Sequence, residues 1–290
     1  LGAELARLAD ATLGAATPAR VGLLFDWNNW WAVEGAIGPI RSKDYVAVVR
    51  KHYAALWRQR VPVDIVWSDS ELAGYDLVVA PMLHMVKPGL AERVEAQVAR
   101  GGTFVTTYFS GVVNENDLAF EGYPGPLARV LGIRVEEIDA LPPGEENQIV
   151  MADGSGSYSC ANLFDLLHSE GAAVLATYGR DFYAGAPALT ANRFGQGQAI
   201  YIASDPEPRL LDDLYARLLA QHGIAPALDA PAGVEVALRQ KGDRQLLFIL
   251  NHNAAPATLA LPGTFHDLLS DTAASGTIDV EGYGVRILAR

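Results

Sequence analysis

Five carboxylates could take part in chemistry, because each lies in a segment expected to follow a strand: Asp26, Glu34, Glu115, Asp117 and Glu121. Hydrolysis of a glycosidic bond needs two carboxyl groups a few ångströms apart, in environments that separate their pKa values. The sequence does not place these five side chains relative to one another. A solvated acidic rim accounts for them more simply, since Asp and Glu side chains are mostly exposed.

Two nucleophiles, Ser110 and Cys160, lack the sequence context of a hydrolase. A Gly-x-Ser-x-Gly elbow needs a glycine two residues before the nucleophile. Tyr108 holds that position before Ser110, and Tyr158 holds it before Cys160. We interpret Cys160 as a semi-buried structural thiol, because free cysteine is among the most buried residue types. We predict no catalytic residue in this chain.

Metal and cofactor sites are not indicated either. The six histidines are scattered, and no pair has the i, i+4 spacing of a His-Glu-x-x-His site. Only His84 lies in a site-like position, just beyond an expected strand. Gly195-Gln196-Gly197 separates two expected strands, whereas a phosphate-binding loop connects a strand to a helix. We therefore predict no metal ion and no cofactor.

Charge and cysteine content limit the partners. Acidic residues outnumber basic ones by 34 to 22, and the net charge of −12 argues against nucleic acid and anionic membrane surfaces. No apolar run approaches the length of a membrane span. The single cysteine excludes an internal disulfide framework, so we expect a reducing, cytoplasmic setting.

An aromatic and amide-rich stretch follows the first expected strand. Residues 21–25 form an apolar run typical of a buried parallel strand, and Asp26, Trp27, Asn28, Asn29, Trp30 and Trp31 follow it directly. The segment past a strand's carboxyl end is where open α/β sheets meet ligands or partners. The tryptophans either fill the domain's own core or face a subunit or a sugar, and the sequence leaves both interpretations open.

Alternating strands and helices predict a parallel sheet with helices on both faces. We expect strands at 21–25, 62–67, 76–80, 103–108, 134–138 and 173–177, and a hairpin with arms at 188–194 and 199–203. We expect helices at 42–60 with Ser42 as N-cap, and at 88–100, 126–131, 161–169 and 208–222. The loop after the fourth strand contains Ser110, Asn114, Glu115, Asn116 and Asp117, and loops of this length usually carry function or an interface.

The sequence patterns at the two ends of the chain differ from the alternating strands and helices of the middle part. Residues 1–13 have apolar residues at helical spacing, and a helix begun in mid-pattern leads us to expect that something upstream has been removed. After a linker at 225–233 only short strand-like runs occur: 234–239, 245–250, 257–261, 265–269, 277–280 and 285–288. They predict a small antiparallel β-sandwich.

Several motifs together closely resemble glycoside hydrolase family 42 β-galactosidases: Phe25–Trp31, Asp76–Leu83, Phe109–Asp117, Gly122–Leu127 and Val130–Ile133. The resemblance runs in order over nearly the whole chain. It implies a linker helix at 1–16, a flavodoxin-like or class I glutamine amidotransferase-like trimerisation domain at 17–224, and a C-terminal β domain at 225–290. Family members carry their catalytic glutamates in a preceding (β/α)8 barrel, so the resemblance assigns no catalytic residue here.

The resemblance makes the chain the non-catalytic assembly region of a retaining β-galactosidase, with a homotrimer, the absent barrel and, through the intact enzyme, a galactoside as partners. We expect the contact or cleft-lining surface to include Trp27, Asn28, Trp30, Trp31, Ser110, Asn114, Glu115, Asn116 and Asp117. Two alternatives remain open. The first is an amidotransferase-like hydrolase that uses Cys160 or Ser110, and the second is a sugar-binding module.

Overall fold

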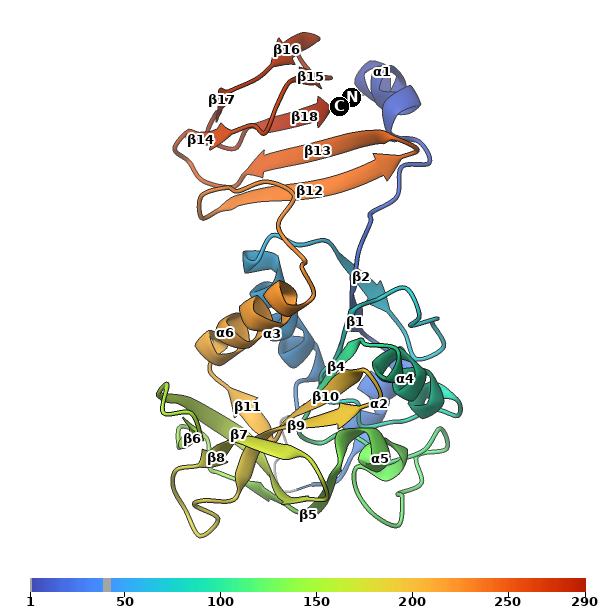
Figure 1. Cartoon of the computed structure of the whole chain (residues 1–290), viewed down its shortest axis with the longest axis vertical. Helices are drawn as coiled ribbons and strands as arrows, with labels where there is room; N and C mark the ends of the chain where they lie inside the picture. The colour runs from blue at the N-terminus through green and yellow to red at the C-terminus, as the bar shows by residue number, and fades with distance from the viewer. Residues whose placement is uncertain (1, 39–42) are drawn as a thin grey trace. The chain divides into compact units, whose positions relative to one another are not determined.

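The strands predicted at 21–25, 76–80 and 103–108 form a parallel core in the computed structural model (Figure 1), whereas those predicted at 134–138 and 173–177 pair antiparallel. β1 (Val21–Leu24), β3 (Leu77–Ala80) and β4 (Thr103–Thr107) are parallel neighbours and are buried at every position. β2 (Val63–Val66) follows β1 at the edge of the sheet. Strands covered on both faces need not alternate apolar and polar residues, which explains the apolar runs of β1 and β3.

The structure describes residues 2–38 and 43–290, so the predicted N-cap Ser42 and the first residue of the opening helix, Leu1, lie outside the described residues. The chain forms two units. The larger unit contains Arg20–Ala55 and Ile65–His222. The smaller unit contains Leu1–Ala19, Leu56–Asp64 and Gly223–Arg290.

The sheet of the larger unit is mixed rather than parallel throughout. β10 (Gly197–Ile202) pairs in parallel with β4 and antiparallel with β9 (Pro187–Phe194), which confirms the predicted hairpin. Its turn is made by Gly195, whose φ of 59° is a left-handed value that glycine adopts readily. The remaining strands extend the sheet past β9: β5 (Ile133–Ala140), β6 (Asn147–Met151), β7 (Ser157–Ser169), β8 (Ala173–Tyr178) and β11 (Ser204–Pro206).

The helix predicted at 161–169 is wrong, because these residues belong to the long strand β7. Leu163, Phe164 and Leu167 have a spacing that also suits a helix face, and periodicity over so short a segment does not separate the two structures. β7 pairs antiparallel with β5, β6 and β11, so tertiary pairing decides the conformation. The left-handed φ of Asn162, 68°, lies within this strand.

The other helices predicted between residues 42 and 222 are confirmed: α3 (Tyr45–Arg58), α4 (Leu90–Ala99), α5 (Ala128–Leu131) after a 3₁₀ turn η1 (Gly125–Leu127), and α6 (Pro208–Gln221). α6 begins with Pro208, whose fixed φ suits the first helical position. One face of α6 is buried through Leu211, Leu214 and Leu218, as the apolar stripe predicts.

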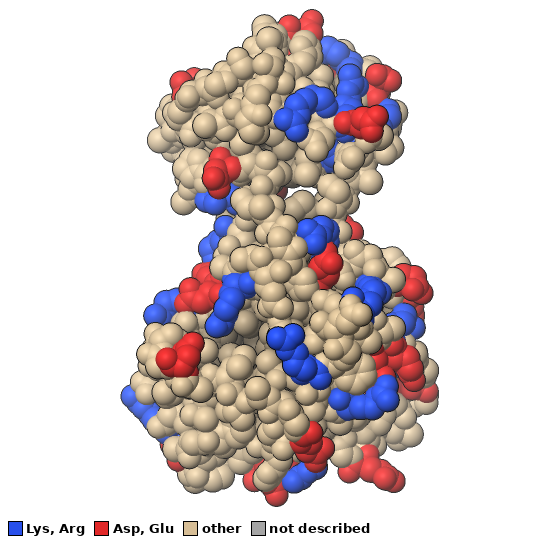
Figure 2. Space-filling view, viewed as in Figure 1, with Lys and Arg blue, Asp and Glu red and all other residues tan. Residues whose placement is uncertain are grey.

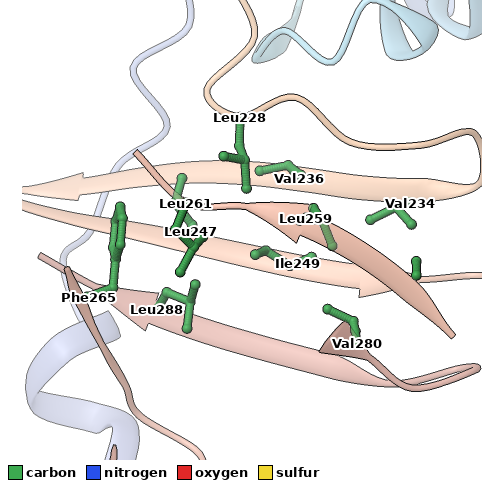
Figure 3. Packing of buried hydrophobic residues seen from close by; sticks show 11 residues of the cluster. Leu228, Val234, Val236, Leu247, Ile249, Leu259, Leu261, Phe265, Val280 and Leu288 are labelled. Carbon is green, nitrogen blue, oxygen red and sulfur yellow. The ribbon is translucent and has the colours of Figure 1, made fainter. Parts of the chain in front are cut away.

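The C-terminal residues form the predicted antiparallel β-sandwich. One sheet has the order β12-β13-β18-β15-β16, and the other pairs β14 with β17. The bounds are β12 (Val234–Lys241), β13 (Arg244–Asn251), β14 (Ala257–Ala260), β15 (Phe265–Asp267), β16 (Thr272–Ala274), β17 (Thr277–Val280) and β18 (Val285–Ala289). Figure 3 shows Leu259 and Val280 in the same apolar cluster as Leu247 and Ile249.

The opening helix α1 (Gly2–Thr12) belongs to the same unit as this sandwich. Ala11 and Ala15 are buried in a cluster with Leu246 and Ala289. Past the helix, the backbone of Ala16 exchanges two hydrogen bonds with Gln240, at 2.9 and 2.8 Å. The segment 2–16 therefore completes the apolar face of β13 and β18 and extends the edge of β12.

Replacing Ala11 by Glu should loosen the smaller unit, because the charge would lie against the apolar cluster of α1 and β13. We expect the free energy of unfolding of this unit to fall by about 3 kcal/mol. Hydrogen exchange in β12, β13 and β18 would report it. Leu5→Glu on the exposed side of α1, where Leu5 is 58% exposed, serves as the control. Equal loss of protection in both variants would contradict this packing.

Candidate functional site

The tryptophan-rich stretch forms a helix that the sequence reasoning missed, α2 (Trp27–Gly35). Asp26 is its N-cap: the carboxylate accepts hydrogen bonds from the backbone N–H groups of Asn28, at 2.9 Å, and Asn29, at 3.4 Å. Aspartate directly before the first helical residue is a known start signal, so a sequence rule could have found this helix. The carboxylate fixes the direction in which α2 leaves the sheet.

The helix places its aromatic rings on one exposed face. Trp27 and Trp31 are 57% and 61% exposed, and Trp30 is half-buried. The ring centroid of Trp27 lies 5.2 Å from that of Trp30 and 6.4 Å from that of Trp31, as expected for i, i+3 and i, i+4 neighbours. The indole N–H of Trp30 donates to Glu34 at 2.7 Å. Trp27 and Trp31 therefore do not fill the core of this chain.

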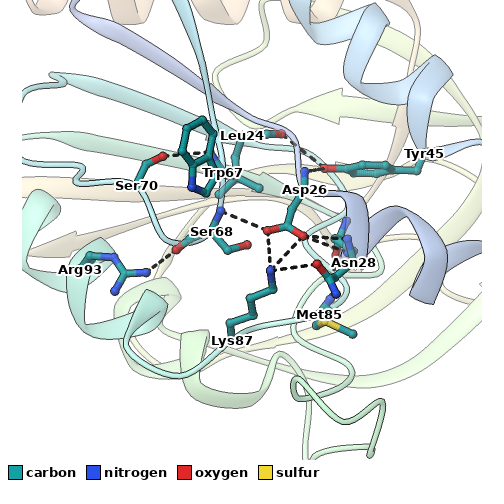
Figure 4. Close-up of polar contacts among 11 residues, drawn as sticks. Leu24, Asp26, Asn28, Tyr45, Trp67, Ser68, Ser70, Met85, Lys87 and Arg93 are labelled. Carbon is teal, nitrogen blue, oxygen red and sulfur yellow. Dashed lines mark hydrogen bonds and ion pairs between the residues drawn. The ribbon is translucent and has the colours of Figure 1, made fainter.

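An ion pair between the buried Asp26 and the partly buried Lys87 holds the start of this helix (Figure 4). The Lys87 ammonium donates to both carboxylate oxygens of Asp26, at 2.9 and 3.1 Å, and lies 3.3 Å from the side-chain oxygen of Asn28. The backbone N–H of Ser68 donates to Asp26 at 3.3 Å. Burial alone would raise the pKa of Asp26, but the hydrogen bonds from Lys87 and Ser68 outweigh it and leave the pKa below its ordinary value of 3.8.

The buried amide of this segment is Asn29, whereas the predicted site residue Asn28 is exposed. The Asn29 amide donates to the carbonyl oxygen of Met82 at 3.0 Å and accepts from the N–H of Met85 at 2.8 Å. It thus ties α2 to the segment that follows β3. Only the phase of the helix distinguishes the two adjacent asparagines, and the sequence did not reveal that phase.

Ser110 connects the same segment to the loop after β4. Its hydroxyl accepts from the N–H of Leu83 at 2.9 Å and pairs with the Thr106 hydroxyl at 2.9 Å. Because Thr106 donates its own proton to the carbonyl oxygen of Ala80, Ser110 donates to Thr106. Ser110 is only 1% exposed, so it positions the loop rather than presenting a surface.

The tip of this loop is an exposed turn built on Asn114. The Asn114 side-chain oxygen accepts from the N–H groups of Asn116, at 2.9 Å, and Leu118, at 3.1 Å. Glu115, Asn116 and Asp117 are exposed. Among the described residues no hydrogen bond or ring contact joins this turn to the tryptophans, so the predicted site residues form two groups.

Cys160, His84 and Asp165 are buried, whereas the candidate carboxylates Glu34 and Glu121 are exposed. Burial raises the pKa of the Cys160 thiol to about 11 and lowers the pKa of His84, which stacks on Phe109 at 4.3 Å, to about 4. Burial also raises the pKa of Asp165 to about 7, and this carboxyl group accepts from the hydroxyl of Tyr201 at 2.5 Å.

Surface charge is mixed on the face shown in Figure 2, where Lys and Arg side chains are interspersed with Asp and Glu. That face lacks the clustered basic side chains that nucleic acid requires. Within residues 2–38 and 43–290, no group of three or more His, Cys, Asp or Glu side chains is arranged to hold a metal ion. No helix in the same ranges is long and apolar enough to cross a membrane.

Comparison with known proteins decides the family. Residues 19–225 match the family model of the β-galactosidase trimerisation domain, and residues 233–290 match that of the β-galactosidase C-terminal domain. The chain belongs to glycoside hydrolase family 42. The predicted resemblance is thereby confirmed, and the chain corresponds to the trimerisation and C-terminal regions of family 42 β-galactosidases.

Individual relatives agree with this assignment to family 42. β-Galactosidase BgaA from Planococcus sp. is 48% identical over the whole chain, and β-galactosidase Pbg from Clostridium perfringens is 41% identical over 99% of it. The crystal structure of β-galactosidase from Bacillus circulans sp. alkalophilus matches the whole chain with a TM-score of 0.97 at 48% identity. The chain spans 44% of that structure's chain, 44% of BgaA and 43% of Pbg.

The ion pair predicts a pH-dependent contribution to the stability of this family 42 chain. Because the folded pKa of Asp26 lies below 3.8, its stabilisation is complete above that pH and is lost as the pH falls through the folded pKa. Lys87→Met leaves the buried carboxylate unpaired, so the free energy of unfolding at pH 7 should fall by about 3 kcal/mol. Asp26→Asn should make stability less sensitive to acid than in the wild type.

Urea unfolding at several pH values measures both effects. Arg134→Met is the control, because it breaks an exposed pair with Glu170 at 3.7 Å, and such pairs contribute about 1 kcal/mol or less. If Lys87→Met and Arg134→Met lower the free energy of unfolding by the same amount, the Asp26–Lys87 pair does not hold α2.

Proposed function

We propose that this chain is the assembly region of a β-galactosidase that hydrolyses terminal β-D-galactosides in the cytoplasm, with its catalytic glutamates in a barrel outside these 290 residues. The match to a trimerisation domain and a coverage below half of BgaA and Pbg support this proposal. We propose residues 1–16 as the linker helix from that barrel, 17–224 as a flavodoxin-like, amidotransferase-like domain, and 225–290 as the C-terminal domain.

The observation that carries the proposal is the exposed pair Trp27 and Trp31 on the anchored helix α2. Tryptophan is enriched at the energetic centres of interfaces, because it offers a large and stiff contact area. The Asp26 cap and the Asn29 hydrogen bonds hold the rings in place before any partner binds, which lowers the entropy lost on association. We propose that this face contacts a second copy in a closed ring of three.

The exposed turn of Glu115, Asn116 and Asp117 is a second surface in this proposal, facing the neighbouring copy or the barrel. Ser110 and Asn114 shape the loop beneath it through the bonds to Leu83 and Asn116. A turn fixed by its own asparagine can present carboxylate and amide groups without a large loss of conformational freedom on binding.

The hydrolase alternative finds no support in the geometry. Phe109 occupies the left-handed position two residues after β4, with a φ of 59°, where a nucleophile elbow would hold its serine or cysteine. Ser110 donates to Thr106 rather than to a base. Cys160 is 2% exposed, and its raised pKa keeps it a thiol at neutral pH.

Replacing both Trp27 and Trp31 by Ala should shift the sedimentation mass of the purified chain from three copies of 31.0 kDa towards one. Loss of two central aromatic anchors weakens an interface by about 4 kcal/mol or more, roughly a thousandfold in dissociation constant. Phe182→Ala removes a 72% exposed aromatic ring outside α2 and should leave the mass unchanged. A trimer that survives the double change at micromolar concentration would exclude α2 as the contact.

Cys160 should resist alkylation in the native chain. At pH 7.5 the buried thiol, with a pKa of about 11, is almost entirely protonated, and the thiolate is the reactive form. We expect iodoacetamide to label less than about a tenth of the chains in an hour, and all of them after unfolding in urea. Rapid stoichiometric labelling of the folded chain, detected by mass spectrometry, would revive the hydrolase alternative.

A further inference from the structure

A pocket of about 700 Å³ opens at the carboxyl edge of the mixed sheet. Residues just past the carboxyl ends of three neighbouring parallel strands line it: Met82 follows β3, Tyr108 follows β4, and Asp205 lies in the short strand β11 that follows β10. The first turns of α3 and the segment after β5 close its sides. Open α/β sheets bind ligands at this edge, and the volume suits a small molecule.

A polar triad of Asp205, Lys51 and Asn162 lies in this pocket. The carboxylate of Asp205 accepts from the Lys51 ammonium at 2.5 Å and from the Asn162 amide at 2.7 Å. Lys51 also donates to the carbonyl oxygen of Pro206 at 3.2 Å. A carboxylate can accept about four hydrogen bonds and an ammonium can donate three. The triad therefore keeps capacity both to accept and to donate.

The rest of the lining is largely apolar: Val48, Met82, Leu141, Pro142, Pro143 and Leu163. An entirely apolar ligand would leave the triad without the bonds that water gives it. The lining also carries two acidic side chains, Asp44 and Asp205, and two basic ones, Lys43 and Lys51, so its charges balance and favour neither an anion nor a cation. A neutral molecule with neighbouring hydroxyls suits both features, because each hydroxyl donates and accepts while its C–H face covers the apolar wall.

The backbone holds two of these lining residues in a conformation that side chains rarely adopt. Met82 has a φ of 43° and Asn162 a φ of 68°. Met82 is fixed from both sides, because its N–H donates to Thr107 at 2.9 Å and its carbonyl oxygen accepts from Asn29 at 3.0 Å. Such strain persists where the surroundings over-determine it, which is common at ligand sites.

We propose that this pocket binds a neutral mono- or disaccharide, and that the Asp205–Lys51–Asn162 triad forms hydrogen bonds with two neighbouring hydroxyl groups of the sugar. The proposal is independent of the assembly role, because all the lining residues belong to one chain. Sugar binding to the pocket is also measured separately from the oligomer mass. It makes Asp205 the acceptor, and Lys51 and Asn162 the donors, in sugar recognition.

Saturation-transfer NMR on the purified 290-residue chain tests the proposal with D-galactose, lactose and inorganic phosphate as probes. We expect a saturable signal from at least one sugar, with a dissociation constant on the order of 1 mM, and none from phosphate. Asp205→Asn should weaken sugar binding about tenfold or more, whereas Asp69→Asn, which changes an exposed carboxylate of the same unit, should leave it unchanged.

A second pair of variants keeps the test valid if Asp205→Asn does not fold. Ala47 is exposed and lines the pocket, so Ala47→Trp should fill it and abolish binding. Arg50→Trp places the same ring at an exposed position of α3 outside the lining and should leave binding intact. Absence of saturable binding by either sugar overturns the proposal. Sugar binding that survives Ala47→Trp, or binding of phosphate alone, overturns it as well.

Discussion

The contact between the Asp26 carboxylate and the Lys87 ammonium determines how the candidate surface is built. It joins the end of β1, the first turn of α2 and the segment that leads into α4, and Ser68 adds the backbone after β2. Two opposite charges removed from water stabilise a structure only when each is fully hydrogen-bonded. The Asp26 carboxylate also caps α2. The same charged group therefore pairs with Lys87 and fixes the direction of the helix.

Much of the fold could be predicted from the sequence, because β1 and β3 are apolar runs and Pro81 ends the second of them. The small β-sandwich could also be predicted, from its short strand-like runs and the turn residues between them. The strand β7 could not, since Leu163, Phe164 and Leu167 suit either structure locally. Its pairing with β6 is a local hairpin across residues 152–156, but the pairing with β11 joins residues about 40 positions apart, which no local pattern encodes.

In the candidate site, the sequence indicated which residue types are present but not the direction in which each side chain faces. The sequence indicated that aromatic and amide groups gather after β1, and Trp27 and Trp31 are indeed exposed there. It could not tell that Asn29 turns inwards while Asn28 faces solvent, nor that Ser110 is buried. The pocket triad was beyond reach for a different reason, because Lys51 and Asp205 lie 154 positions apart and neither has an unusual neighbourhood in sequence.

The joining of α1 to the C-terminal strands has a consequence for synthesis on the ribosome. Arg239 donates to the carbonyl oxygen of Ala15 across 224 positions, so the helix emerges long before the strands that cover it. At ordinary translation speeds that interval is roughly 10 to 45 s. During this interval the sheet of the larger unit can fold. The side of α1 that later packs on β13 and β18 remains exposed to solvent and accessible to chaperones. The strands β12, β13 and β18 thus complete a structure that α1 began.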